Sequence, residues 1–111
     1  MSDINVGFVG LGNVGSKVAN NIISNGYKLY VHDLDEKKSK NLVSKGSIFC
    51  NSIEELVPQV SILITCLPSP KSVKDVLLKC IPLFNESHLW IDMSTTDEND
   101  MKYLSELVFD K

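Results

Sequence analysis

Strand-like and helix-like segments alternate along this sequence of 111 residues. Short runs rich in β-branched and aromatic residues favour strands, and they cover residues 4–10, 27–33, 47–50, 60–67 and 88–94. Apolar residues at helical spacing mark helices over 13–25 and 71–79, and a polar, Lys-rich run that ends at Gly46 indicates a surface helix over 35–45. Capping-box spacings, Ser52 with Glu55 and Thr95 with Glu98, begin a short helix at 52 and a helix over 95–109. Strands that alternate with helices form a parallel sheet covered on both faces. Right-handed crossovers then favour the strand order 3-2-1-4-5, so we expect a Rossmann-type doubly wound α/β fold in three layers, α/β/α.

Length and net charge limit the number of domains and the kinds of partner that we expect. We expect residues 1–111 to form one domain with a single set of packed layers. The net charge of −3 argues against nucleic acid and anionic membranes as partners, and no apolar run approaches the roughly 20 residues of a membrane span. The first residues lack the pattern of a signal or transit peptide, so we expect a cytoplasmic protein.

The three cysteines have no C-x-x-C spacing, and we interpret them as buried apolar residues.

A glycine-rich loop joins the first predicted strand to the first predicted helix. Gly10, Gly12 and Gly15 have the spacing G-x-G-x-x-G in the strand–loop–helix context that this pattern requires. Gly10 permits the tight turn, Gly12 allows a pyrophosphate to approach the backbone, and Gly15 lets the helix pack against the strand. The helix N-terminus offers free N–H groups to phosphate. A turn that binds no ligand is the alternative interpretation.

Asp33 lies at the end of the second predicted strand, eighteen residues beyond Gly15. A carboxylate at this place accepts hydrogen bonds from the adenosine ribose hydroxyls and repels the 2′-phosphate of NADP. Further acidic residues follow it, and the chain contains no Arg. Lys37 and Lys38 could assist a 2′-phosphate, but we interpret them as a solvated helix face. The sequence therefore favours NAD over NADP.

Four separated motifs resemble those of one enzyme family. "GFVGLGNVG", "NGYKLYVHD", "CLPSP" and "WIDMSTTDE" occur in the order found in the N-terminal domain of the β-hydroxyacid dehydrogenase family, which includes 3-hydroxyisobutyrate dehydrogenase and 6-phosphogluconate dehydrogenase. Members of that family that prefer NADP typically carry Asn-Arg where Asp33 and Leu34 stand here. Glu98 replaces a proline of the family pattern, and we expect the helix start to tolerate it.

The resemblance implies cofactor-binding roles at matching positions. The glycine loop would hold the pyrophosphate, Asp33 with Leu34 would hold the ribose, and the turn after the fourth strand would run beside the nicotinamide half. Hydroxyls after the fifth strand would face nicotinamide or substrate, or would only cap the last helix. These residues are Gly10, Leu11, Gly12, Asn13, Val14, Gly15, Asp33, Leu34, Leu67, Pro68, Ser69, Ser94, Thr95 and Thr96.

The family's catalytic Lys and its neighbouring Asn belong to a following helical domain, and no Lys here has the matching sequence context. We therefore assign no catalytic or metal-binding residue. We expect these residues to bind a dinucleotide without turnover, and a 3-hydroxy acid only together with that domain. A dinucleotide-sensing regulatory domain is the first alternative, although the "LP" turn and "DMST" segment argue against it. An S-adenosylmethionine methyltransferase is the second, and the complete G-x-G-x-x-G argues against it.

Overall fold

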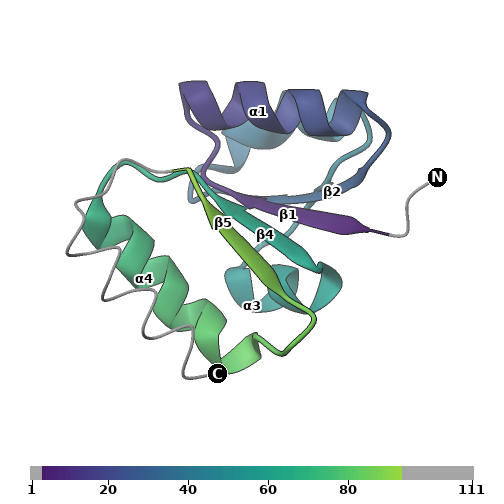
Figure 1. Cartoon of the computed structure of the whole chain (residues 1–111). Coiled ribbons are helices and arrows are strands. Elements are labelled where there is room, and N and C mark those ends of the chain that lie inside the picture. Colours follow the sequence, from purple (N-terminus) through teal and green to yellow (C-terminus); the bar gives the residue numbers. More distant parts are fainter. Residues whose placement is uncertain (1–3, 94–111) are drawn as a thin grey trace.

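The sheet has the predicted parallel topology. The computed structural model describes residues 4–93, and the strands in that part of the chain form one sheet in the order β3-β2-β1-β4-β5 (Figure 1). All neighbouring strands pair in parallel. The strand bounds are β1 Asn5–Val9, β2 Lys28–His32, β3 Ile48–Phe49, β4 Ile62–Thr65 and β5 Leu89–Asp92. The expected Rossmann-type doubly wound arrangement is thus confirmed.

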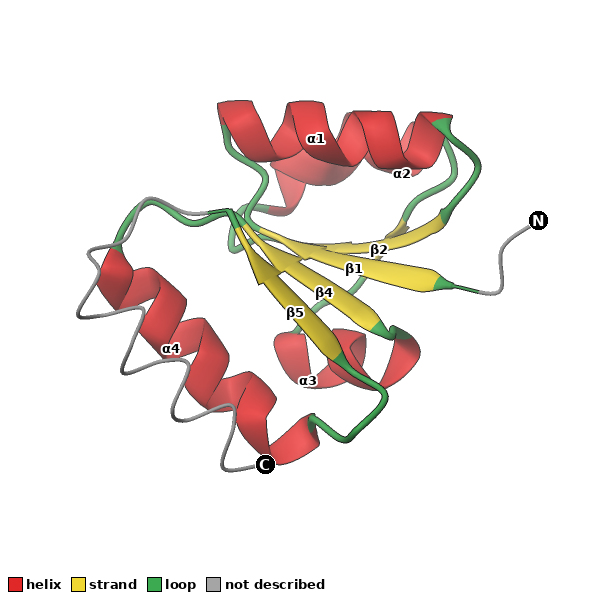
Figure 2. Ribbon diagram, viewed as in Figure 1, coloured by secondary structure: helices red, strands yellow, loops and turns green. Residues whose placement is uncertain are grey.

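Helices cover both faces of the sheet (Figure 2). The first crossovers place α1 (Asn13–Ser24) and α2 (Lys40–Ser44) on one face, while α3 (Ile53–Leu56) and α4 (Pro70–Cys80) lie on the other. Short 3₁₀ turns, η1 (Glu36–Ser39), η2 (Val57–Gln59) and η3 (Ile81–Leu83), complete the connections. In the described part of the chain, no helix is long and apolar enough to cross a membrane.

Alternation of side chains along the strands divides the apolar core in two. Phe8 and Val31 are fully buried against α1 and α2, in a cluster that also holds Val6, Leu11, Ala19, Leu29, Leu42 and Ile64. Leu63 is fully buried on the opposite face with α3 and α4, in a cluster that holds Val9, Tyr30, Cys50, Ile53, Leu56, Val57, Val60, Val73, Leu77 and Cys80. Both faces are apolar because the sheet is covered on both sides.

Local hydrogen bonds move several element ends away from the predicted ones. The single helix predicted over 35–45 is instead η1 followed by α2, because Asp35 caps the turn through Lys37 N–H (3.1 Å) and the Ser39 hydroxyl donates to the Glu36 carbonyl (2.7 Å). Val14 has the helical spacing of the apolar face of α1 that also holds Val18 and Ile22, but it lies at the first turn of that helix and is 61% exposed. The predicted helix over 95–109 lies outside the described residues.

Ser52 caps α3 as its capping-box spacing predicts, and Gly26 ends α1. The Ser52 hydroxyl accepts the Glu55 N–H at 3.1 Å, which begins α3, while the Glu55 carboxylate accepts from Asn51 N–H at 3.4 Å. Gly26 follows α1 with φ of +88°, a conformation that glycine adopts without steric cost and that ends helices.

Candidate functional site

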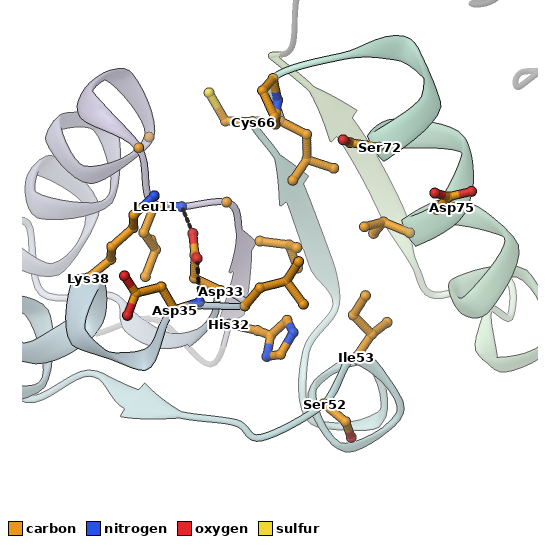
Figure 3. A pocket seen from close by; sticks show the side chains of 18 of the residues that line it. Leu11, His32, Asp33, Asp35, Lys38, Ser52, Ile53, Cys66, Ser72 and Asp75 are labelled. Carbon is orange, nitrogen blue, oxygen red and sulfur yellow. Dashed lines mark hydrogen bonds between the residues drawn. The ribbon is translucent and has the colours of Figure 1, made fainter.

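A cavity of about 880 Å³ opens at the carboxyl ends of β1, β2 and β4. Strands of a parallel sheet all end at the same edge, and this edge is where doubly wound folds bind ligands. Figure 3 shows the two walls: Leu11, Asp33, Asp35 and Lys38 on one side, and Ser72 and Asp75 of α4 on the other. The full lining is Val9, Gly10, Leu11, Gly12, Val14, Gly15, His32, Asp33, Leu34, Asp35, Lys38, Asn51, Ser52, Ile53, Glu54, Cys66, Leu67, Pro68, Ser72, Asp75, Val76 and Lys79.

The glycine loop borders this cavity, and its steric requirements are those predicted. Gly10 has φ of +99°, and a Cβ there would lie 2.2 Å from the Cys66 carbonyl oxygen. A Cβ on Gly15 would lie 2.2 Å from the Gly10 carbonyl oxygen, so only glycine allows α1 to begin this close to β1. A Cβ on Gly12 would meet no atom within 4 Å. Gly12 is therefore open toward the space that a ligand would occupy.

The N-terminus of α1 fits a phosphate. Its N-cap residue is Gly12, which has no side chain to accept a hydrogen bond, and the first turn carries no acidic residue. The first backbone bond of the helix runs from Ser16 N–H to the Gly12 carbonyl at 2.8 Å. Within residues 4–93, the N–H groups of Asn13, Val14 and Gly15 donate to no acceptor. The helix start thus presents N–H donors and a positive dipole end, with no acidic residue in its own first turn.

Asp33 lies between the glycine loop and the start of η1. Its Oδ2 accepts the Leu11 N–H at 2.7 Å, and its Oδ1 accepts the Asp35 N–H at 2.8 Å (Figure 3). The carboxylate is half-buried and borders the cavity. Each carboxylate oxygen has two lone pairs, so each keeps one acceptor position for a hydroxyl group.

The other predicted site residues divide into three groups. Leu34, Leu67 and Pro68 line the cavity, and Leu34 is 98% exposed. Asn13 and Ser69 do not line it: Asn13 is exposed on α1, and the Ser69 hydroxyl caps α4 by accepting the Ser72 N–H at 3.1 Å. The third group, Ser94, Thr95 and Thr96, lies outside the described residues. The ligand-binding roles of all these residues stay predictions.

One wall of the cavity was not predicted from the sequence. Ser72, Asp75, Val76 and Lys79 of α4 face it at helical spacing, so the periodicity of that helix could have indicated them once the strand order was known. The segment that follows β3, residues 51–54, also contributes. It could have been found because β3 ends at the same edge as the other strands.

A hydrogen-bonded group centred on the buried Thr65 joins the carboxyl ends of β4 and β5. The Thr65 hydroxyl accepts the Trp90 Nε1–H at 3.0 Å and donates to Asp92 Oδ1 at 2.8 Å. Thr65 and Asp92 are also directly paired in the sheet register. Because Thr65 is 2% exposed, this group fixes the end of β5 at the edge where the cavity opens.

The three cysteines are free thiols. Cys50 and Cys80 are buried as expected, whereas Cys66 is half-buried and borders the cavity. Burial raises the pKa of all three thiols, that of Cys80 to about 12, and the Asp92 carboxylate adds to the increase in the pKa of Cys66. Within residues 4–93, no group of three or more His, Cys, Asp or Glu side chains could hold a metal ion.

Comparison with known proteins places this chain in a family. The family model of the NAD binding domain of 6-phosphogluconate dehydrogenase matches residues 5–111. A probable mitochondrial 3-hydroxyisobutyrate dehydrogenase of Arabidopsis thaliana is 35% identical over 106 residues, which are 91% of this chain and 30% of that protein. The cytokine-like nuclear factor N-PAC of Homo sapiens is 26% identical over 110 residues, covering 96% of this chain and 20% of that protein. The chain spans about a third of the length of the dehydrogenase relatives.

Solved structures have the same fold. A 3-hydroxyisobutyrate dehydrogenase of Mycobacterium tuberculosis superposes with a TM-score of 0.91 and 23% identity, covering 96% of this chain and 37% of that one. An imine reductase of Pseudomonas sp. superposes with a TM-score of 0.89 and 25% identity, covering 97% and 38%. Because the family model spans nearly the whole sequence, this chain belongs to the NAD-binding domain family of 6-phosphogluconate dehydrogenase and 3-hydroxyisobutyrate dehydrogenase, and its cofactor is a dinucleotide.

Proposed function

We propose that the cavity at the carboxyl edge of the sheet binds NAD, with the pyrophosphate at the start of α1 and the adenosine ribose at Asp33. The observation that carries this proposal is the N-terminus of α1. The helix begins at Gly12 on the cavity wall, and the N–H groups of its first turn donate to no acceptor among residues 4–93. Gly12 leaves room for the phosphate groups, and Asn13 and Val14 supply N–H groups beside it.

The charges on the cavity wall support NAD rather than NADP as the preferred cofactor. Asp33 and Asp35 place two carboxylates where a 2′-phosphate would lie, and the chain has no Arg. Lys38 borders the cavity and offers one cation on the same wall, whereas Lys37 does not border it. With two carboxylates against one ammonium group, a 2′-phosphate dianion is repelled.

The remaining lining suggests where the two ends of the dinucleotide lie. Leu34, Ile53 and Val76 are apolar residues of the cavity lining that suit the adenine ring. Leu67 and Pro68, at the end of β4, suit the nicotinamide half, and the hydroxyls of Ser94, Thr95 and Thr96 remain candidates there. When bound, the nicotinamide ring supplies the hydride acceptor, and the residues of this chain bind and orient it.

The relatives suggest the reaction that the cofactor serves. Several are named as 3-hydroxyisobutyrate dehydrogenases, so we place this domain in an enzyme that oxidises a 3-hydroxy acid with NAD. We expect the 111 residues alone to bind dinucleotide without turnover, since the catalytic Lys motif of the resembling family has no counterpart in them. The cytoplasmic location stays a prediction. Dinucleotide binding without catalysis remains the second candidate function, and the match to a protein named as a nuclear factor favours keeping it.

Fluorescence titration of the 111-residue chain with NADH, NADPH and S-adenosylmethionine tests the proposal. The one Trp, Trp90, serves as energy donor to the reduced nicotinamide ring. We expect NADH to bind most tightly, and Asp33→Ala to weaken NADH roughly ten- to hundredfold, because hydrogen bonds to a charged acceptor are lost. Glu36→Ala, a nearby exposed carboxylate outside the cavity lining, is the control for charge and should leave the affinity within about twofold.

Two outcomes contradict parts of this proposal. Equal losses of NADH and NADPH affinity in Asp33→Ala would refute ribose recognition by Asp33. Oxidation of 3-hydroxyisobutyrate by the 111-residue chain with NAD, above the rate without protein, would refute the expectation of binding without turnover.

A further inference from the structure

The loop that borders the phosphate position is inherently adaptable. Leu11 lies between Gly10 and Gly12, and glycine restricts the backbone less than any other residue. A loop of this kind binds anions well only if its donors are already in place, since ordering them on binding lowers affinity. Something besides the glycines must therefore hold Leu11.

Two side chains from different elements hold both backbone polar groups of Leu11. Asp33 Oδ2, beyond β2, accepts the Leu11 N–H at 2.7 Å. The Ser16 hydroxyl, one turn into α1, donates to the Leu11 carbonyl at 2.8 Å. The Leu11 side chain is only 2% exposed and packs in the core between the sheet and α1. The residue is thus fixed at its N–H, its C=O and its side chain. Each glycine neighbour is held at a single backbone group, since the Gly10 N–H donates to the His32 carbonyl at 3.1 Å and the Gly12 carbonyl accepts the Ser16 N–H at 2.8 Å.

We propose that Ser16 and Asp33 are positioning residues that clamp Leu11 and so hold the glycine loop in its phosphate-binding conformation. Ser16 does not line the cavity, so its effect on a ligand passes through Leu11. Asp33 has this role in addition to the ribose recognition proposed above. The inference rests on the proposed dinucleotide function, because it concerns how the same cavity is prepared for pyrophosphate.

The clamp and ribose recognition predict different changes in affinity for ligands with and without ribose hydroxyls. ADP carries the pyrophosphate and both ribose hydroxyls, whereas 2′,3′-dideoxy-ADP keeps the pyrophosphate and offers Asp33 no hydroxyl. Loss of the Ser16 hydroxyl should weaken both ligands by the same factor, about three- to tenfold, which is the effect of one hydrogen bond. A residue that contacts only the ribose would affect ADP alone.

The experiment compares Ser16→Ala, Ser16→Thr and Ser24→Ala in the 111-residue chain. Ser24 is exposed at the far end of the same helix and serves as the matched control. Calorimetric titration with ADP and 2′,3′-dideoxy-ADP measures affinity, and amide hydrogen exchange at Leu11 and Gly12 measures loop mobility. We expect Ser16→Ala to weaken both ligands equally and to speed exchange at the loop without changing exchange in β4. Ser16→Thr, which keeps the hydroxyl, should restore affinity to within about twofold.

Asp33→Ala forms the second arm and keeps the test decisive if Ser16→Ala does not fold. Removing a carboxylate beside a bound anion should, by charge alone, strengthen binding of 2′,3′-dideoxy-ADP. The clamp predicts the opposite sign, a loss of affinity with faster exchange at Leu11. Wild-type affinity for both ligands in Ser16→Ala, or unchanged or tighter 2′,3′-dideoxy-ADP binding in Asp33→Ala, overturns the proposal. Failure of the wild-type chain to bind ADP or NADH refutes the proposed function instead.

Discussion

Replacing Gly15 with Ala should damage folding and binding together. The added Cβ would lie 2.2 Å from the Gly10 carbonyl oxygen, which is backbone, and 3.3 Å from Phe8 Cε1, which is fully buried. The start of α1 and the glycine loop must therefore separate by about 1 Å in an interior packed without spare volume. That shift also strains the hydrogen bond from Gly10 N–H to the His32 carbonyl (3.1 Å).

The size of the effect follows from three contributions. Overpacking of this kind costs about 1–3 kcal/mol, and weakening one or two loop hydrogen bonds adds about 1 kcal/mol. Alanine inside a helix recovers about 1 kcal/mol relative to glycine. The free energy of unfolding should thus fall by about 1–3 kcal/mol, which lowers the urea midpoint by about 1–2 M for a domain of this size. Displacement of the loop should also weaken NADH at least tenfold.

Gly12→Ala, at the middle glycine of the motif, is the matched control. A Cβ on Gly12 meets nothing within 4 Å, so the free energy of unfolding should fall by less than about 1 kcal/mol. Because Gly12 borders the cavity, NADH affinity should nevertheless drop at least tenfold. Urea unfolding followed by Trp90 fluorescence, with NADH titration of the folded variants, separates the two effects. Wild-type unfolding of Gly15→Ala, or wild-type NADH affinity of Gly12→Ala, would refute this steric reasoning.

Three further perturbations test other parts of the structure. Thr65→Val removes the acceptor of Trp90 Nε1–H and should lower the free energy of unfolding by about 1–3 kcal/mol, measured in urea, whereas no change would contradict a role for this part-buried hydrogen bond. Burial raises the pKa of Cys80 from 9.0 to about 12, so the stability that this thiol contributes is complete below pH 9 and is lost as the pH rises from 9 through 12. Raising the pH from 8 to 10 should therefore lower the unfolding free energy of Cys80→Ala by about 1.4 kcal/mol less than it lowers that of the wild type. An equal decrease in both proteins would exclude the Cys80 thiol as the cause. Lys38→Ala should weaken NADPH more than NADH in fluorescence titrations while Lys37→Ala changes neither, since only Lys38 borders the cavity; equal effects of the two substitutions would contradict this.

The sequence could predict features that depend on local spacing or on the order of elements. G-x-G-x-x-G between a strand and a helix predicted the tight turn at Gly10 and the close packing of Gly15, and the structure shows that no side chain fits either position. Alternation of strands and helices predicted the order β3-β2-β1-β4-β5, because crossover handedness leaves few alternatives. The place of Asp33 at the cavity followed from its position at the end of β2.

Contacts between elements were decided by the tertiary structure. No spacing rule indicates that Ser16 and Asp33 bind the two polar groups of Leu11, since this depends on how closely α1 and β2 approach the loop. The α4 wall of the cavity and the pairing of Thr65 with Asp92 likewise require the register and twist of strands far apart in the chain. The sequence alone determined which backbone could surround a dinucleotide. The steric effect of a glycine depends on its immediate neighbours, and the strand order follows from the succession of strands and helices. Only the folded structure decided which side chains hold that backbone in place, because hydrogen bonds between elements form within a few tenths of an ångström and depend on packing.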